Sequence, residues 1–547
     1  MGAATPMSTN GTSQADDNGK LLRKAEHLML IGAQLSTENN LETLLEAILT
    51  GAMELTDADG GSLYILEERT LSFSLIHTSS LNLHMGGSSE SPITFPSIPL
   101  EHADGSPNLN TIVTSAVHEK RLINIPDAYK NTEYDFSGTH EFDRNTGYHS
   151  QSFLAMPMQD HEGNIIGVLQ LLNATDQNNA KVVPFSSEDE QLIAALAAQA
   201  AVAINQKRLI EGMENLLASL VRLIATAIDE KSPHTAGHCR RVPEITMDFA
   251  RAINNCSETY GNLSFDEKQM KELEMAAWMH DCGKIATPEH LIDKRTKLQT
   301  VVDRIELVDA RIEIMRRDAE IALLRSSTGQ SQPQAVAECR ETLDKLAAAR
   351  TFLHRCNTGG EFLRPEDRQQ ITELADLTLH VSDAGEKVCL LDQQDVKNLL
   401  IPRGTLNDEE RKIINNHIVS TINMLEELPF PAYLSNVPLI AGGHHERMDG
   451  KGYPRGIPAA ELPIQSRILT IADVFEALTA SDRAYRRPNS LKEALTIMGH
   501  MCREGHFDPE LFTFFIRERV YLPYAKRHMV AERIENVDPE TVLALFA

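Results

Sequence analysis

The chain has 547 residues, 42% of them hydrophobic, and its 78 acidic against 52 basic side chains give a formal net charge of −26. This length exceeds what one hydrophobic core usually organises and predicts roughly two to four domains. The acidic balance disfavours a nucleic-acid backbone as partner, and no apolar run reaches the roughly eighteen residues of a membrane span. We therefore expect a multidomain protein that binds no DNA and has no membrane span.

Two features of the sequence predict a cytoplasmic location. Residues 1–20 are rich in Ser, Thr, Asn and Gly and lack the charged-then-apolar order of an export signal, so a disordered tail is expected there. The seven cysteines include no C-x-x-C pair, which disfavours a disulfide framework or a cysteine zinc site. A reducing compartment fits this pattern best.

Residues 21–205 predict an α+β domain. Apolar residues recur at helical spacing over 41–49, and short strand-like runs follow at 62–66, 70–78 and 164–173. This succession resembles the GAF family of small-molecule sensor domains. The resemblance covers about a third of the chain and implies a regulatory ligand site.

A short signature at the end of this segment sharpens the resemblance. GAF domains that bind cyclic nucleotides carry Asn-Lys followed by Phe-x-x-x-Asp-Glu, although Ala174 stands here in place of the lysine. Four positions match: Asn173, Phe185, Asp189 and Glu190. The match implies that these residues contact a small ligand such as a cyclic nucleotide. In the alternative, Phe185 packs in a core and Ser186 or Ser187 caps the next helix.

A long helix is predicted after this signature. Apolar and small residues alternate at steps of four and three from Leu192 to Ala227. A seam sustained over five heptads predicts a connecting signalling helix at 206–231, with coiled-coil character from about 190. Such a helix could pair with its twin in a parallel homodimer; in the alternative it packs on its own domain.

The second half of the chain is expected to be almost wholly helical. Charged helical segments between 300 and 350, broken near Ser326 and Pro333, predict a helical hairpin inside an insertion that spans about 300–403. The insertion interrupts a predicted domain at 232–530. Residues 531–547 are predicted to form a C-terminal helical tail.

Two clusters in this second domain indicate a metal site. The first runs from His280-Asp281 to Lys284, and the second from His444-His445 through a glycine-rich turn to Pro454. Adjacent histidines beside carboxylates are costly to keep for packing alone, and imidazole and carboxylate groups are ligands of divalent transition metals. The clusters therefore predict a metallohydrolase.

Together with further histidines and a distant aspartate, the clusters resemble the ligand set of the HD phosphohydrolase superfamily. The Gly-Tyr-Pro segment narrows the resemblance to its HD-GYP branch, whose members are phosphodiesterases of cyclic di-GMP. The resemblance implies one metal ion held by His238, His280, Asp281 and Asp473. It implies a second ion held by His417, His444 and His445. Asp281 would bridge the two ions, and such a pair can activate water at neutral pH.

The number and the kind of metal ions follow from the same residues. His234 lies four residues before His238, where family members with a third ion use a glutamate. An imidazole there could coordinate from the same helical face, although we predict a two-metal site. Nitrogen-rich ligation with carboxylates favours iron or manganese over magnesium, with zinc as the alternative.

The resemblance also implies substrate contacts. Asp281 and Lys284 are the predicted catalytic residues, and Lys284 would steady the scissile phosphate or protonate the leaving oxygen. Arg483 and Arg486 suit the second phosphate of a cyclic dinucleotide, and Tyr453 the pocket rim. The alternatives are a solvated helix end for Lys284 and a surface salt bridge for Arg486.

The leading prediction is a dimeric phosphodiesterase that hydrolyses cyclic di-GMP to pGpG, to GMP or to both, under the control of the GAF domain. One alternative is a catalytically silent receptor of cyclic di-GMP. Another is an HD phosphohydrolase that acts on a different cyclic dinucleotide or a nucleoside phosphate. The complete ligand clusters favour an enzyme over a silent receptor.

Overall fold

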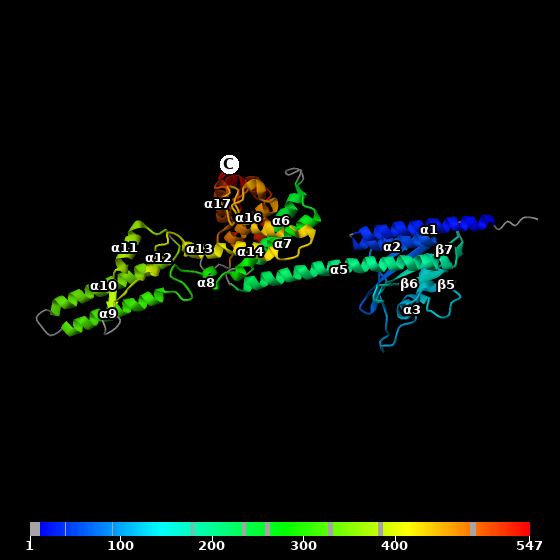
Figure 1. Ribbon diagram of the computed structural model, residues 1–547, viewed down its shortest axis with the longest axis horizontal. Helices are drawn as coiled ribbons and strands as arrows, with labels where there is room; N and C mark the ends of the chain where they lie inside the picture. The colour runs from blue at the N-terminus through cyan, green and yellow to red at the C-terminus, as the bar shows by residue number, and fades with distance from the viewer. Residues whose placement is uncertain are drawn as a thin grey trace, which may run out of the picture. The chain divides into compact units, whose positions relative to one another are not determined.

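The computed structural model describes residues 11–38, 40–89, 91–176, 179, 181–231, 237–256, 263–326, 332–360, 362–380, 387–481 and 488–547. The chain divides into two compact units, Met1–Leu216 and Leu217–Ala547, and helix α5 (Ser187–Lys231) runs through the boundary between them (Figure 1). His234, Arg483 and Arg486 lie outside the described residues. Within those residues, no helix combines the length and the apolar character that a membrane span requires.

An antiparallel sheet forms the centre of the first unit. Its eight strands, counted over the described residues, are β1 (Ala58–Glu67), β2 (Thr70–Thr78), β3 (Leu83–Gly86), β4 (Ile98–Pro99), β5 (Ile123–Ile125), β6 (Phe153–Gln159), β7 (Ile165–Thr175) and β8 (Val182–Val183). The strand order is β3-β2-β1-β7-β6-β5, with β4 beside β2 and β8 beside β7. Because successive strand residues face opposite sides, Leu63 and Tyr64 of β1 enter two different cores.

Helices cover both faces of this sheet (Figure 1). They are α1 (Gly11–Thr37), α2 (Leu41–Thr56), α3 (Ile112–Glu119), α4 (Ser137–Thr146) and the first half of α5. Asn40 starts α2 by accepting hydrogen bonds from the backbone N–H groups of Glu42 and Thr43. The apolar sides of α1, α2 and α5 form one core with the sheet, and α3 forms the other.

The ends of the first unit differ from the sequence prediction. Helix α1 begins at Gly11, so residues 11–20 are helical where a disordered tail was expected. The first turns of α5 also depart from a free coiled-coil seam, because Leu192, Leu196 and Ile204 are buried in the core of their own unit. A row of exposed apolar side chains begins at Val202. We call it the α5 stripe: Val202, Leu209, Ile210, Met213 and Leu216.

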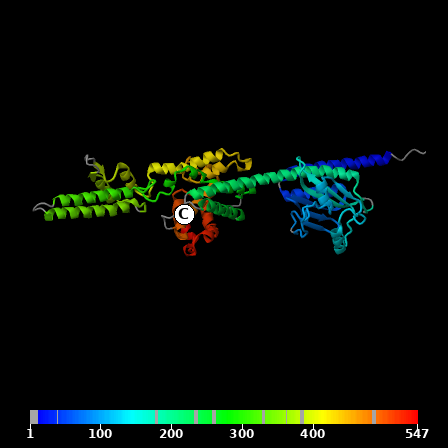
Figure 2. The same ribbon diagram turned by 90° about the horizontal axis from the view of Figure 1, so that it is seen from below.

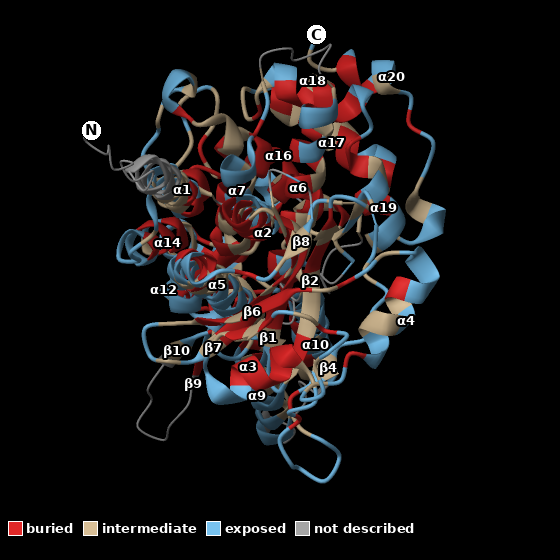
Figure 3. Ribbon diagram, turned by 90° about the vertical axis from the view of Figure 1, so that its right-hand side faces the viewer, coloured by how far each residue is buried: buried red, intermediate tan, exposed pale blue. Residues whose placement is uncertain are grey.

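One helical core organises the second unit (Figure 3). Its helices are α6 (His238–Asn255), α7 (Glu267–Met279), α8 (Glu289–Ile292), α13 (Asp408–Asn415), α14 (His417–Glu426), α15 (Val437–Gly442), α16 (Ile464–Thr479), α17 (Leu491–Arg503), α18 (Pro509–Arg517), α19 (Tyr521–His528) and α20 (Pro539–Leu543). Short 3-10 turns are η1 (Cys282–Ala286), η2 (Ala432–Leu434), η3 (Ala459–Glu461) and η4 (Ala531–Arg533). Val542 and Leu543 are buried in this core, so the C-terminal segment belongs to the domain.

The predicted insertion is a small subdomain with its own core. The hairpin expected there consists of α9 (Ile305–Ser326) and α10 (Gln332–Asn357), which lie side by side (Figures 1 and 2). Three further kinds of element complete it: α11 (Pro365–Ala375), the strand pair β9 (Thr378–His380) and β10 (Lys387–Cys389), and α12 (Gln393–Leu399). Leu353, Ile371 and Leu399 are fully buried in this core. The strand pair is the exception to an otherwise helical second unit.

Candidate metal centre

The turn after α7 carries His280 and Asp281, and a glycine fixes its position. A Cβ at Gly283 would lie 2.5 Å from the Thr421 backbone nitrogen and closer still to the His417 carbonyl oxygen. Only glycine therefore lets η1 approach the start of α14 this closely. The Gly283 N–H donates to the Thr421 hydroxyl at 2.9 Å. Two segments that lie far apart in the sequence meet here.

Helices α6 and α16 carry two further predicted ligands, His238 and Asp473. His238 is the first residue of α6, and its Nε2 lies 3.2 Å from Asp473 Oδ1 and 3.3 Å from Asp281 Oδ2. On the other side of the ring, Nδ1 donates to Glu476 Oε2 at 2.5 Å. Glu476 is fully buried and also accepts from Arg241 Nε at 2.6 Å. Glu476 thus orients His238 from behind.

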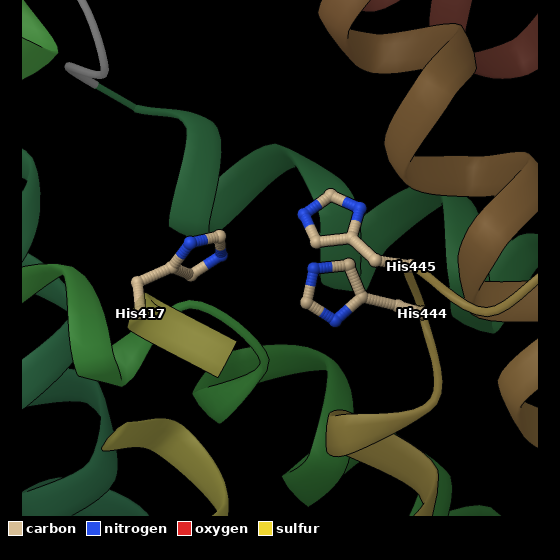
Figure 4. A group of neighbouring side chains, drawn as sticks. All are labelled: His417, His444 and His445. Atoms are coloured by element: carbon tan, nitrogen blue, oxygen red, sulfur yellow. The ribbon is translucent and has the colours of Figure 1, made fainter. Parts of the chain in front are cut away.

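A second group of imidazoles lies opposite. His417 opens α14, while His444 and His445 follow α15, and the three rings converge (Figure 4). The ring centroids of His444 and His445 are 4.1 Å apart, and those of His417 and His445 are 5.4 Å apart. The ligating atoms of the three residues all lie within 4.8 Å of one another. The ligating atoms of His238, His280 and Asp281 likewise lie within 4.8 Å of one another.

Asp281 stands between the two groups. Its Oδ2 faces the first, at 3.3 Å from His280 Nε2 and 2.5 Å from Lys284 Nζ. Its Oδ1 faces the second, at 3.1 Å from His417 Nε2 and 3.9 Å from His444 Nε2. One carboxylate therefore presents a different oxygen to each cluster.

Backbone contacts fix which nitrogen of each ring is free. The Nδ1 atoms of His280, His417 and His444 lie 2.7, 2.6 and 2.7 Å from carbonyl oxygens three residues earlier. Because a carbonyl only accepts, each Nδ1 carries the proton and leaves the Nε2 lone pair directed at Asp281. This is the second-layer pattern of metal-ligating histidines.

The donor set fits a pair of cations. Asp281 Oδ1, His417 Nε2 and His444 Nε2 are buried without a hydrogen-bond partner, a situation that folded proteins rarely tolerate. Ligand atoms about 2.1 Å from one ion lie about 3.0 to 3.4 Å from each other. The observed separations of 3.1 to 3.3 Å around Asp281 match that spacing.

The electrostatics supply neutral imidazoles and charged carboxylates. Burial lowers the pKa of His444 well below its usual value and that of His445 to about 4. Burial alone would raise the pKa of Asp281, but Lys284 and His280 outweigh it and hold that pKa well below its usual value. Hydrogen bonding to His238 likewise holds the pKa of Asp473 low against burial. His444 and His445 therefore offer lone pairs, and Asp281 and Asp473 offer negative charge, at neutral pH.

Glu446 organises the glycine-rich loop after the paired histidines. Its buried carboxylate accepts from the backbone nitrogens of Arg455, Gly456 and Ile457 at 2.8, 3.2 and 3.2 Å. The loop holds Tyr453 against the site, where its ring stacks on His445 with centroids 4.7 Å apart. Burial, with Asp281 and Asp473, raises the pKa of Tyr453, so the phenol keeps its proton.

Sequence reasoning missed three features of this centre. Glu446 and Glu476 are buried carboxylates that hold the loop and His238. Glu476 lies one helical turn after Asp473 on α16, a spacing that could have identified it. The third feature is a cavity of about 310 Å³ beside His417, with this remaining lining: Ala286, Thr287, Lys412, Ile413, Asn416 and Ser420.

The four signature residues of the first unit make contacts within the fold. The Asn173 side chain accepts from the Gln151 N–H at 2.7 Å and donates to the His149 carbonyl at 2.8 Å. Phe185 is buried in the core. Asp189 accepts from Ser186 and Lys24, and Glu190 accepts from Asn124. None of the four lines the cavity of about 390 Å³ in this unit, and their contact with a ligand stays a prediction.

Two family models match the chain. The GAF domain model matches residues 40–204, and the HD domain model matches residues 394–511. The chain therefore contains a GAF domain and an HD domain, which confirms the predicted order of an α+β domain before a largely helical one. His417, His444, His445 and Asp473 lie inside the HD match, whereas His238 and His280-Asp281 precede the insertion.

Curated relatives match over part of their length. The 3'3'-cGAMP-specific phosphodiesterase 1 of Vibrio cholerae is 38% identical over 121 residues, which are 22% of this chain and 27% of that protein. A cyclic di-GMP phosphodiesterase of Thermotoga maritima is 33% identical over 125 residues, 22% of this chain and 32% of that protein. The cyclic di-GMP phosphodiesterase response regulator RpfG of Xanthomonas campestris is 30% identical over 196 residues, 34% of this chain and 49% of that protein. The chain thus spans less than half the length of these relatives.

One solved structure aligns with part of the chain. The GAF domain of an Acinetobacter phosphoenolpyruvate-protein phosphotransferase aligns with 35% of this chain and 98% of its own length, at 17% identity and a TM-score of 0.25.

Proposed function

We propose that the chain is a metal-dependent phosphodiesterase that hydrolyses cyclic di-GMP to pGpG, to GMP or to both. The observation that carries the proposal is the convergence of four histidine Nε2 atoms on the two oxygens of Asp281. The relatives from Thermotoga and Xanthomonas are cyclic di-GMP phosphodiesterases, which supports the choice of substrate.

Two divalent ions are proposed for the centre, iron or manganese first, because imidazoles outnumber carboxylates in the donor set. One ion would lie among His238, His280, Asp281 and Asp473, and the other among Asp281, His417, His444 and His445. Bound metals would supply Lewis-acid polarisation of the phosphoryl oxygen and a water of lowered pKa. A third ion at His234 remains the alternative to this two-metal site.

Asp281, Glu476 and Lys284 have separate proposed roles around the ions. Asp281 holds both halves of the centre in register, and the Glu476 carboxylate keeps His238 in the required tautomer. The Lys284 side chain lies against Asp281 and is 23% exposed, and Asp281 outweighs burial in raising the pKa of its amine. The ammonium group therefore stays protonated at neutral pH, so that it can steady the scissile phosphate or give a proton to the leaving oxygen.

Substrate contacts are proposed for Tyr453, for Arg483 and Arg486, and for a cavity beside His417. Tyr453 presents a protonated phenol at the rim, and Arg483 and Arg486 are proposed to bind the second phosphate. The cavity beside His417 has room for further parts of a dinucleotide, and Lys412 is exposed there without an ion-pair partner among the described residues. We propose that Lys412 also contacts the second phosphate, the one that is not cleaved.

Regulation by the GAF domain is proposed to act through α5. Lys231, the last residue of this helix, donates to the carbonyl oxygens of Lys284, Ile285 and Thr287 at 3.3, 2.5 and 2.7 Å. Asp229 accepts from the Cys239 N–H at the start of α6. The end of α5 therefore touches the segment that carries the metal ligands, and a displacement of the helix would reach them.

A homodimer is proposed through the α5 stripe. Four apolar side chains of the stripe are between 57% and 71% exposed: Val202, Leu209, Met213 and Leu216. Pairing with a second copy would bury them. Met213→Glu should convert a dimer to a monomer in size-exclusion chromatography with light scattering, whereas Glu211→Gln on the same helix should leave the dimer intact. A reducing, cytoplasmic location is proposed as well. The seven cysteines are unpaired, which supports it.

Two other functions are open to the same site. Hydrolysis of 3'3'-cGAMP is favoured by the relative of 38% identity from Vibrio cholerae. A silent receptor would bind the cyclic dinucleotide without cleaving it. Incubation of Mn²⁺- or Fe²⁺-loaded protein with cyclic di-GMP and with 3'3'-cGAMP, followed by chromatography of the products, separates the three. The proposal expects linear pGpG or GMP from cyclic di-GMP, none with Asp281→Asn, and it fails if the loaded wild-type protein gives neither.

A further inference from the structure

The GAF domain contains a cavity of about 390 Å³ that none of the predicted ligand residues lines. It lies on the face of the sheet that carries α3, between strand residues such as Ser62 and Gln170 and the segment around α4. Its volume falls at the lower end of the roughly 300 to 1,000 Å³ typical of small-molecule sites. Its lining therefore decides what kind of molecule it can accept.

Aromatic rings dominate that lining. Seven of the 23 lining residues are Phe or Tyr. Tyr64 and Phe73 have centroids 4.4 Å apart, Phe73 and Phe95 are 5.6 Å apart, and Phe95 and Phe142 are 6.4 Å apart. A chain of rings at these distances presents flat apolar faces and edges, the surfaces on which a planar ligand stacks.

Positive charge is absent from the lining. It contains no Lys, Arg or His, and its single charged side chain is Asp135. The Asp135 carboxylate accepts from the Ser137 N–H at 2.8 Å, so an anionic group already occupies the start of α4. The start of α3 is capped as well, because the Thr111 hydroxyl accepts from the Thr114 N–H. A phosphate in this cavity would lose its hydration without gaining a cation, which is costly.

The Gln170 side chain on the sheet side of the cavity can orient a ligand. Gln170 Oε1 accepts from the Tyr64 hydroxyl at 3.2 Å, and Gln170 Nε2 has no hydrogen-bond partner among the described residues. The Tyr148 hydroxyl is already engaged, donating to Asp59 at 2.5 Å and accepting from Asn173 at 3.0 Å. A ligand therefore meets an amide donor on an aromatic floor, which calls for an acceptor such as a carbonyl or a ring nitrogen.

We propose that the GAF cavity binds an uncharged, planar heteroaromatic molecule with a hydrogen-bond acceptor directed at Gln170, and excludes cyclic nucleotides because they carry a phosphate. The inference does not depend on the activity of the HD domain. The proposed ligand differs from the cyclic nucleotide that the signature predicted, because the lining offers aromatic rings and an amide but no cation.

The test uses the full chain and defined probes. Quinolin-2-one offers a carbonyl acceptor, indole is a planar probe without a strong acceptor, and cyclic AMP and cyclic GMP are the anions. Binding is followed by saturation-transfer NMR and by calorimetry. Quinolin-2-one is expected to bind at least about tenfold more tightly than indole, and the two cyclic nucleotides are expected not to bind at millimolar concentration.

Two variants locate the site. Gly138 lines the cavity, and a Cβ there would meet no heavy atom within 4 Å, so Gly138→Phe should place a ring in the mouth without disturbing the backbone. This variant should abolish quinolin-2-one binding. Glu141→Phe, on the same helix but outside the lining, should bind normally. Gln170→Leu should bring the affinity for quinolin-2-one down to that for indole.

Three outcomes would overturn the proposal. One is a cyclic nucleotide that binds more tightly than quinolin-2-one, and the second is quinolin-2-one binding that survives Gly138→Phe. The third is the absence of binding by both bicyclic probes at millimolar concentration while circular dichroism shows a folded chain. None of these outcomes changes whether the HD domain cleaves cyclic di-GMP, which is measured separately.

Discussion

Glu476→Gln tests whether the buried carboxylate behind His238 tunes the metal centre. The substitution keeps the side-chain volume but removes a charge that is fully buried, 2.5 Å from His238 Nδ1 and 2.6 Å from Arg241 Nε. In the wild-type protein burial lowers the pKa of His238, but this charge together with Asp281 and Asp473 outweighs burial and raises that pKa well above its usual value. With a neutral amide behind it, the imidazole donates its Nε2 lone pair to a metal ion less strongly, and its tautomer is no longer fixed.

The expected magnitude follows from this geometry. Loss of a carboxylate partner behind a metal-ligating histidine lowers metal affinity about 10- to 100-fold, which corresponds to about 1.4 to 2.7 kcal/mol. The full range applies because both partners are buried and solvent screens little of the charge. Calorimetric titration of the metal-free chain with Mn²⁺ measures the change, with hydrolysis of cyclic di-GMP at saturating Mn²⁺ as a second readout.

Glu272→Gln is the matched control for this prediction. Glu272 is also a buried carboxylate of the second unit, and it accepts from the Asn436 N–H at 2.8 Å without contacting a proposed ligand. It should change stability and leave Mn²⁺ affinity within a factor of about two. If Glu476→Gln and Glu272→Gln bind Mn²⁺ as tightly as the wild-type chain, the role of Glu476 is refuted.

Three further predictions test the surroundings of the centre. Gly283→Ala forces η1 away from α14 and should lower the free energy of unfolding by about 1 to 3 kcal/mol in urea titrations, whereas Gly360→Ala, whose Cβ meets nothing within 4 Å, should not. Lys412→Ala should raise KM for cyclic di-GMP about tenfold with kcat retained. The neighbouring Arg411→Ala, outside the cavity lining, should leave KM unchanged. Equal KM values in the two variants would exclude the assignment of Lys412 to a phosphate. Lys231→Met removes three hydrogen bonds to the η1 segment and should lower kcat about tenfold at unchanged metal content, and an unchanged kcat would show that the end of α5 does not support the site.

The sequence predicted more of the chemistry than of its support. The motif that begins at His280-Asp281 was singled out because such residue types rarely serve packing alone, and the resemblance to the HD superfamily added Asp473; the structure brings the three side chains together. The roles of Glu476 and Glu446 were missed: Glu476 lies one helical turn after Asp473 and Glu446 directly follows His445, but neither position says which group the carboxylate binds. Their roles depend on partners that lie 238 and about ten residues away along the chain, a relation that only the three-dimensional structure reveals.

Periodicity also has limits that α5 illustrates. The same heptad pattern runs through the buried Leu196 and the exposed Met213, because a helix can present one apolar seam first to its own sheet and then to solvent. The strand pair in the insertion escaped prediction because strands of three residues carry too little alternation to recognise. In the GAF domain, a signature match located Asn173 but not the cavity, which depends on side chains from many separate segments.

The bridging role of Asp281 is the central claim, and metal analysis of the purified full chain tests it most directly. Elemental analysis of protein prepared with Fe²⁺ or Mn²⁺ should find two ions per wild-type chain, and no more than one in Asp281→Asn, with hydrolysis lost. Two ions retained in Asp281→Asn, or no bound transition metal in the wild-type chain, would contradict the account.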